Sequence, residues 1–226
     1  MTLLEKNTLF EVNYYKTAID PNSYNKKEIM DTIIYNYEKN PNRESTLKNS
    51  PDISFHNYYG NFDNPKYKKI NFTQLGLVYD NIIKNYMTSI YGTNINNILY
   101  RWSIDNINVG INGHMECHNH LSQYADGYSN QFVMIHYLSF DSNFHEHTKF
   151  ENPLSIGPFI DYMKIGINLD KSKKENSMYR VNNYINSKED DLIIFPSFIN
   201  HKVAMSKKPH SNKLRVVVAS SISVKS

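Results

Sequence analysis

The sequence predicts a mainly β protein, a barrel or sandwich, preceded by packing helices. In the first hundred residues, apolar side chains recur at the three- and four-residue spacing of amphipathic helices. From residue 97 onward, short β-type runs alternate with turn residues. Because an all-β fold commonly takes about 200–250 residues as one unit, we expect one domain over residues 1–226. Its helical and loop support region would be 1–96, and its β core 97–226.

The first predicted helix contains Ile29, Ile33 and Tyr37 on one face. Ser23 can cap its start, and the Asn40-Pro41 pair should end it, because a proline disfavours helical backbone at the residue before it.

The second predicted helix begins at Asn71, with Gln74 placed like the partner in a capping box. It should end at Gly92, a residue type that favours helix C-termini. Its predicted apolar face consists of Phe72, Leu75, Val78, Ile82, Tyr86 and Ile90. The segment Asn42–Lys69 between the helices lacks periodicity, so we expect a long surface segment that could help close over a site.

Eight runs in the second half of the chain have the composition of strands and are bounded by turn residues. They cover residues 98–104, 107–111, 114–120, 131–140, 159–167, 179–185, 191–195 and 214–224. This number of strands suits a barrel or sandwich, with the helices on an outer face.

Composition excludes several classes of protein. A net charge of +3, with scattered basic residues, gives no clear nucleic-acid signal. No apolar stretch reaches the roughly 18–20 residues of a membrane-spanning helix. The single cysteine, Cys117, cannot form an intrachain disulfide and suits a reducing compartment. We therefore expect a soluble, cytoplasmic protein, in the cytoplasm of a host cell if it is viral.

Three histidines form a candidate metal site. In an extended strand His118 and His120 point to the same side, so both rings can approach one ion. A third ligand must come from elsewhere, and His201 follows a buried strand that ends at Pro196. Imidazoles bind Fe, Zn, Cu and Ni, so this pattern predicts a metal with open positions for other ligands.

Arg215 leads the last apolar strand, where its charge requires a carboxylate or solvent. A bidentate acid ligand would satisfy it.

The other histidines and Cys117 have simpler interpretations. His136 fits a strand residue with a satisfied hydrogen bond, and His145 and His147 fit a solvated polar loop that could line a substrate entrance. His210 fits the surface. Cys117, opposite His118 on the strand, fits a small buried residue.

The order of these motifs resembles the 2-oxoglutarate- and Fe(II)-dependent oxygenase superfamily. The matching segments are HNH (118–120), FVMIHYLSF (132–140), TKFENP (148–153), DDLIIFPSFINH (190–201) and KLRVVVASSI (213–222). The closest resemblance is to its phage and bacterial branch with a His-x-His motif, whose sequences open with a Leu-Phe segment, here NTLFEV (7–12).

The resemblance implies a double-stranded β-helix, or jelly-roll, flanked by two or more helices. It implies Fe(II) as the metal, 2-oxoglutarate as cosubstrate and O2 as oxidant, with hydroxylation of an unidentified small or macromolecular substrate and release of succinate and CO2. His118 and His201 match the first and last iron ligands. Arg215 matches the residue that binds the distal carboxylate of 2-oxoglutarate, and Tyr137 lies on a strand that lines the cosubstrate pocket.

The sequence departs from this family at His120, where most members carry Asp or Glu. A site of three histidines has one negative charge fewer. Glu116 and Asp126 are the nearby carboxylates that could replace His120 as ligand.

Two other interpretations stay open. A cupin-like metal protein also has a His-x-His and a later histidine, but Gln123 and Tyr124 stand where its glutamate is expected. It needs no keto-acid anchor such as Arg215. A non-catalytic jelly-roll module, for example a virion component, would bind no stoichiometric Fe(II).

Overall fold

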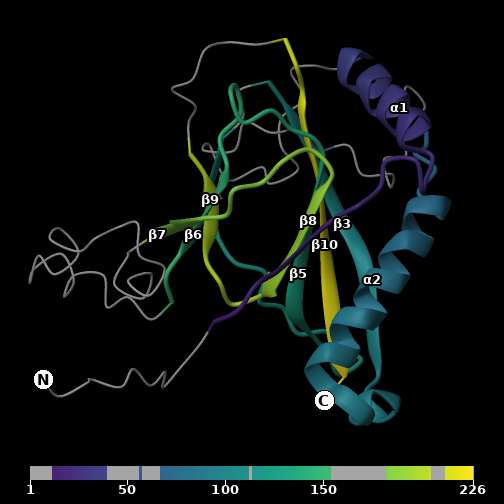
Figure 1. The fold of residues 1–226 in the computed structure, drawn as a ribbon, viewed down its shortest axis with the longest axis vertical. Coiled ribbons are helices and arrows are strands. Elements are labelled where there is room, and N and C mark those ends of the chain that lie inside the picture. Colours follow the sequence, from purple (N-terminus) through teal and green to yellow (C-terminus); the bar gives the residue numbers. More distant parts are fainter. Residues whose placement is uncertain are drawn as a thin grey trace, which may run out of the picture.

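The computed structural model describes residues 12–39, 56–57, 67–111, 114–153, 182–204 and 212–225. Two antiparallel sheets dominate these residues, and two helices cover one of them, as Figure 1 shows. The predicted mainly β class with N-terminal helices is confirmed.

The larger sheet has six strands, and each neighbouring pair is antiparallel. Their order is β1 (Tyr15–Ala18), β8 (Asp191–Pro196), β5 (Tyr128–Ser139), β10 (Arg215–Lys225), β3 (Tyr100–Gly110) and β2 (His56–Asn57). The smaller sheet has the order β4 (Met115–His118), β9 (His201–Val203), β6 (Thr148–Glu151) and β7 (Asn182–Tyr184).

Helices α1 (Lys26–Lys39) and α2 (Thr73–Tyr91) lie on one side of the larger sheet, and the smaller sheet lies on the other (Figure 1). A short 3-10 helix, η1 (Gly92–Asn97), leads from α2 toward β3. Elements therefore lie on both faces of the larger sheet.

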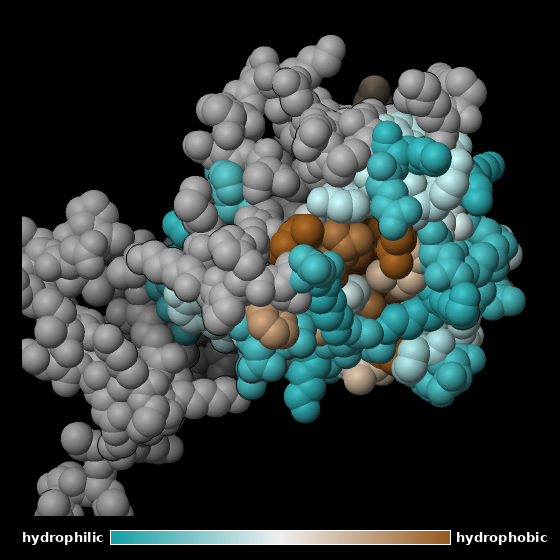
Figure 2. Space-filling view, turned by 90° about the horizontal axis from the view of Figure 1, so that it is seen from above, coloured by the Kyte–Doolittle hydropathy of each residue, from teal (hydrophilic) through white to brown (hydrophobic). Residues whose placement is uncertain are grey.

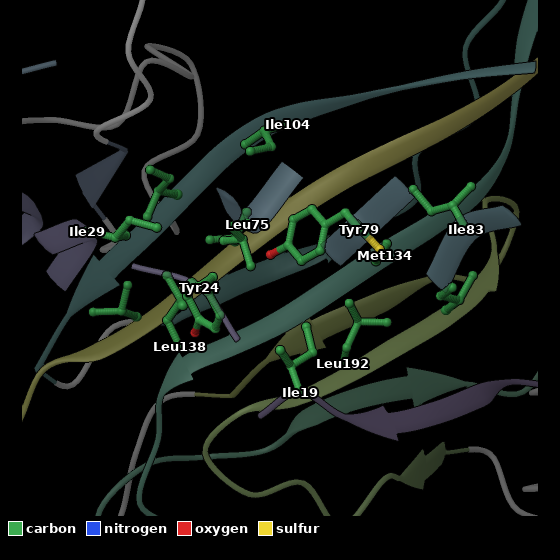
Figure 3. Close-up of a cluster of buried hydrophobic side chains, with 14 of the residues drawn as sticks. Ile19, Tyr24, Ile29, Leu75, Tyr79, Ile83, Ile104, Met134, Leu138 and Leu192 are labelled. Atoms are coloured by element: carbon green, nitrogen blue, oxygen red, sulfur yellow. The ribbon is translucent and has the colours of Figure 1, made fainter. Parts of the chain in front are cut away.

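Alternation along β5 divides its side chains between two cores. Met134 and Leu138 face the helices in one buried cluster, while Val133, Ile135 and Tyr137 belong to a second cluster that includes Phe150 of the smaller sheet. Figure 3 shows the first cluster, where Tyr79 of α2 reaches toward the sheet beside Met134 and Leu75.

The two predicted helices exist, but their starts differ from the prediction. Helix α1 begins at Lys26, so Asn25 precedes it, and the Ser23 hydroxyl donates to Asp20 instead of capping the helix. Helix α2 begins at Thr73, two residues after the predicted start, and Phe72 makes no side-chain cap. The Asn71 side-chain oxygen accepts from the Thr73 backbone N–H at 3.2 Å, as expected of a cap, while no hydrogen bond from Gln74 is found among the described residues. The C-terminus of α2 at Gly92, with φ 56°, is confirmed. The predicted stop of α1 at Asn40-Pro41 lies outside the described residues.

The predicted runs 98–104 and 107–111 form one strand, β3, of 11 residues. Strands β1, β2, β6 and β9 were not predicted. Each has four residues or fewer, which gives too short a pattern to recognise. The predicted strand at 159–167, the NTLFEV opening up to Glu11, His210 and most of the segment 42–69 lie outside the described residues.

No helix in the described ranges has the length and apolar character needed to cross a membrane. Figure 2 views the molecule from above relative to Figure 1, with mostly hydrophilic side chains around a smaller apolar area.

His136 lies in the helix-facing core and is fully buried. Its Nδ1 shares a hydrogen bond of 2.8 Å with the Tyr79 hydroxyl, which confirms the predicted strand residue with a hydrogen-bond partner. Its Nε2 is buried and has no hydrogen-bond partner among the described residues. Burial, with a smaller contribution from the charge of Lys26, lowers the pKa of His136 to about 3. The ring is therefore neutral in the folded protein at neutral pH.

This low pKa predicts a measurable dependence of stability on pH. In the unfolded chain the His136 pKa returns to its ordinary value of 6.5, so between about pH 6 and pH 4 the unfolded state binds a proton that the folded state does not. Relative to His136→Gln, the wild type should lose about 1.4 kcal/mol of unfolding free energy per pH unit as the pH falls. Denaturant titrations at several pH values measure this difference, and parallel curves for the two proteins would contradict it.

Candidate metal centre

The rings of His118, His120 and His201 come together between the ends of β4 and β9. One nitrogen of each ring lies within 4.8 Å of the corresponding nitrogens of the others. The ring centroids are 4.4 Å apart for His118 and His201, and 5.2 Å apart for each pair that includes His120. Among the His, Cys, Asp and Glu side chains of the described residues, these three form the one group whose spacing could hold a metal ion.

Strand pairing places two of the three rings. His118 is the last residue of β4 and lies opposite His201, the first residue of β9. His120 lies just beyond β4, where its backbone N–H donates to the Ser197 carbonyl at 3.0 Å. The Asn130 side-chain amide donates to the His120 carbonyl at 3.1 Å. These two hydrogen bonds fix the backbone of His120 where no strand does.

Hydrogen bonds also determine which ring nitrogen can bind a metal. Nδ1 of His118 lies 2.9 Å from the Glu116 carbonyl oxygen, and Nδ1 of His201 lies 3.1 Å from that of Ile199. A carbonyl only accepts, so both Nδ1 atoms carry the proton and both Nε2 atoms keep a lone pair. Such outer partners are typical of metal-binding histidines, since they fix tautomer and ring orientation.

The surroundings keep two of the rings neutral. Burial, and then the neighbouring His118, lower the pKa of His120 to about 4. Burial, followed by His118 and His120, lowers the pKa of His201 to about 3. Metal binding requires deprotonated imidazole, so at neutral pH these two ligands need not release a proton first. The donor set therefore fits a transition metal that prefers nitrogen ligands.

A carboxylate faces the third ring. Oδ2 of Asp105, on β3, lies 4.0 Å from Nδ1 of His120. The hydroxyls of Ser221 and Ser103 both donate to this carboxylate. Burial raises the pKa of Asp105, and the two serine hydrogen bonds act in the opposite direction.

The two carboxylates considered as replacements for His120 lie elsewhere. Glu116 is exposed on β4 and is not part of the histidine group. Asp126 is exposed and forms an ion pair with Arg101, with 2.5 Å between Nη1 and Oδ2. Its hydrogen bond from Arg101 lowers the pKa of Asp126.

Arg215 forms a second polar group in the interior. It is 3% exposed, its Nη2 donates to the Thr148 hydroxyl at 3.5 Å, and its guanidinium lies 5.6 Å from the centre of the Tyr137 ring. The Tyr137 hydroxyl donates to the same Thr148 oxygen at 2.7 Å. Burial lowers the pKa of Arg215. A buried guanidinium among hydroxyls and rings is suited to bind the carboxylate of a ligand.

One apolar cluster connects the two groups. Tyr137, Phe150 and Phe195 belong to the core between the sheets. The rings of Phe150 and Phe195 lie 6.0 and 5.1 Å from that of His201, while Tyr137 lies against Arg215. His201 and the Arg215 guanidinium therefore both contact residues of one buried apolar cluster, where polar interactions are stronger than in water.

Two sequence-based interpretations are wrong. His145 is 2% exposed, not solvated, because Nε2 lies 3.0 Å from the Lys213 carbonyl and Nδ1 accepts from the backbone of Asp141. Cys117 is exposed, not buried, on β4 at the edge of the smaller sheet.

Three polar residues near the site were not recognised from the sequence: Asp105, Asn130 and Thr148. Asp105 lies between the predicted runs 98–104 and 107–111, where Asp105 and Asn106 suggested a turn, so the sequence did not indicate its place inside β3. Thr148 and Phe150 point to the same, buried side of β6, but that strand is too short to be predicted alone. Asn130 gave no signal, because its partners His120, Ser221 and Ser223 lie 10 to 93 residues away.

No protein-family model and no curated protein sequence matches the chain. Among solved structures it is similar to the non-haem α-ketoglutarate-dependent carbocyclase SnoK from nogalamycin biosynthesis. The TM-score is 0.56 at 9% identity, covering 95% of this chain and 80% of SnoK.

It is also similar to a prolyl hydroxylase from Trichoplax adhaerens (TM-score 0.49, 12% identity, 92% and 82% covered). HygX from Streptomyces hygroscopicus, solved with nickel and 2-oxoglutarate, gives a TM-score of 0.49 at 13% identity, covering 93% and 82%. The likeness to SnoK shows a shared overall fold.

Proposed function

We propose that this chain is a dioxygenase that uses Fe(II), 2-oxoglutarate and O2 to hydroxylate a substrate. The observation that carries the proposal is the pairing of two features in one interior. Three histidines present metal-binding nitrogens, and a buried guanidinium beside Tyr137 and Thr148 offers a site for a carboxylate. The fold shared with a non-haem α-ketoglutarate-dependent enzyme supports the same conclusion.

We further propose that strands β3 to β10 form a double-stranded β-helix. Numbered one to eight in chain order, they give the sheet orders 6-3-8-1 and 2-7-4-5. Successive strands change sheets at every step except between β6 and β7. Eight strands wound in this way between two facing sheets are what a jelly-roll requires. Strand β1 extends this core through its pairing with β8, which supports one domain over residues 1–226.

In the proposed reaction His118, His120 and His201 hold Fe(II), Arg215 binds the distal carboxylate of 2-oxoglutarate, and Tyr137 borders the cosubstrate. When bound, Fe(II) with the keto acid supplies the oxidising power, so that O2 and 2-oxoglutarate give succinate, CO2 and a hydroxylated substrate. The protein orients these reactants and excludes water around them. Its three neutral ligands leave further coordination positions on the metal available.

A turnover assay tests the proposal. The purified full chain with Fe(II), 2-oxoglutarate and ascorbate should form succinate slowly without a primary substrate, and omission of Fe(II) should abolish this. Anaerobic addition of 2-oxoglutarate to the Fe(II) protein should produce a visible absorption band from the chelated keto acid. Metal binding with neither succinate nor the band would favour the cupin-like alternative, and no stoichiometric metal binding would favour a non-catalytic module.

A further inference from the structure

The geometry points to Asp105 as a positioning residue for the metal centre. We propose that its carboxylate accepts a hydrogen bond from Nδ1–H of His120 when Nε2 of that ring binds the metal. The inference rests on the proposed metal site and adds a residue to it.

The first reason is the hydrogen bonding of the three rings. His118 and His201 each direct Nδ1 to a backbone carbonyl, whereas Nδ1 of His120 faces the Asp105 carboxylate at 4.0 Å. This distance exceeds a hydrogen bond by about 1 Å, which a small rotation of the ring can close. A metal at Nε2 withdraws electron density from the ring and makes Nδ1–H a stronger donor. Metal-binding histidines commonly donate to a carboxylate in this way.

The second reason is charge. A site of two histidines and one carboxylate carries one negative charge, while three neutral histidines carry none. Asp105 supplies a negative charge next to His120, on the side of the ring away from the metal. His120 is the position at which the sequence departs from the Asp or Glu of the oxygenase pattern. Attraction between a divalent ion and a carboxylate is strong in a partly buried site. The side chains of Asp105 and His120 are only 27% and 14% exposed.

The third reason is that one network holds both partners. Asn130, 6% exposed, donates to the His120 carbonyl and also to the Ser221 hydroxyl at 3.3 Å. Ser221 in turn donates to Asp105. The Ser223 hydroxyl donates to the Asn130 side-chain oxygen at 2.7 Å and so fixes the orientation of its amide. The same network therefore holds both the carboxylate and the backbone of the histidine.

Titration with Co(II), followed by its visible spectrum and by calorimetry, tests the inference. Asp105→Asn keeps the shape but removes the charge, and it should weaken Co(II) binding about 10- to 100-fold, as loss of an outer carboxylate does. Asp126→Asn is the matched control, because it removes an exposed carboxylate paired with Arg101 and should leave the affinity within about twofold. Thermal unfolding without metal verifies that each variant is folded.

A double-mutant cycle separates action through His120 from a general effect. In a His120→Asp background the site has its own carboxylate, so adding Asp105→Asn should change Co(II) affinity less than about threefold. Equal losses in both backgrounds, or unchanged affinity in the single variant, would overturn the role of Asp105. Failure of the wild type to bind Co(II) would instead overturn the metal site itself.

If Asp105→Asn does not fold, Ser221→Ala is compared with Ser223→Ala, because both remove a hydroxyl that contacts Asn130 but only Ser221 also donates to Asp105. The decisive quantity is the Co(II) affinity of Ser221→Ala relative to that of Ser223→Ala. A several-fold loss of Co(II) affinity supports the inference, and unchanged affinity overturns it.

Discussion

Replacement of His201 by Ala is expected to lower Fe(II) or Co(II) affinity more than about 100-fold, beyond the loss expected for an outer residue. His201 is 4% exposed, its ring lies 4.4 Å from that of His118, and its Nδ1–H is held by the Ile199 carbonyl. Without it, two histidines remain, and one of them lies outside any strand. Calorimetric titration under anaerobic conditions measures the affinity, and succinate formation should disappear with it.

His114→Ala is a suitable control for this experiment. His114 lies just before β4 but is not one of the three grouped histidines, so its replacement should change metal affinity less than about threefold. Because His201 contacts the rings of Phe150 and Phe195, its removal also costs packing energy. Circular dichroism must therefore show a folded His201→Ala protein. A folded variant that still binds metal like the wild type would contradict the proposed site.

The three histidines of the site can be selected from the sequence with simple periodicity. A period of two brings His118 and His120 to one side of a chain, and a buried strand ending at Pro196 places His201 near them. The burial of Arg215 is also a local signal, since it begins an apolar strand. These local rules identify the three histidines, but their meeting depends on the pairing of β4 with β9 and on the hydrogen bonds from His120 to Ser197 and from Asn130 to His120.

Long-range contacts determine the remainder. Asp105 lies at an irregularity in the pairing of β3 with β10, between Ile104, which pairs with Ser220, and Asn106, which pairs with Ala219, and it approaches His120 from there. His145 is buried through a hydrogen bond to the carbonyl of Lys213, 68 residues away. On α2 the inward face includes the fully buried Tyr79, while Ile90 of the predicted face is 42% exposed. The predicted face of α2 was assigned mainly from aliphatic residues and left out Tyr79, whose hydroxyl has its hydrogen-bond partner, His136, on β5.

Arg215→Met is expected to raise the KM for 2-oxoglutarate about 30- to 100-fold, while Fe(II) affinity stays within about threefold. The first effect follows from the loss of charged hydrogen bonds worth about 2–3 kcal/mol to the distal carboxylate. The Fe(II) affinity should change little because Arg215 is not one of the proposed metal ligands. Its guanidinium lies against the rings of Tyr137 and Phe140. Initial rates of succinate formation at varied 2-oxoglutarate, together with metal titration, measure both.

The stability of this variant separates a ligand-binding role from a structural one. A buried guanidinium costs several kcal/mol of desolvation, and replacing buried charges by apolar side chains of similar volume is often neutral or stabilising. If Arg215 serves a carboxylate ligand, Arg215→Met without ligand should unfold at the same denaturant concentration as the wild type or a higher one. The control Arg101→Met, at an exposed ion pair with Asp126, should leave the KM unchanged. A strongly destabilised Arg215→Met with an unchanged KM would make Arg215 a structural residue, because its charge would then be needed by the fold and not by the cosubstrate.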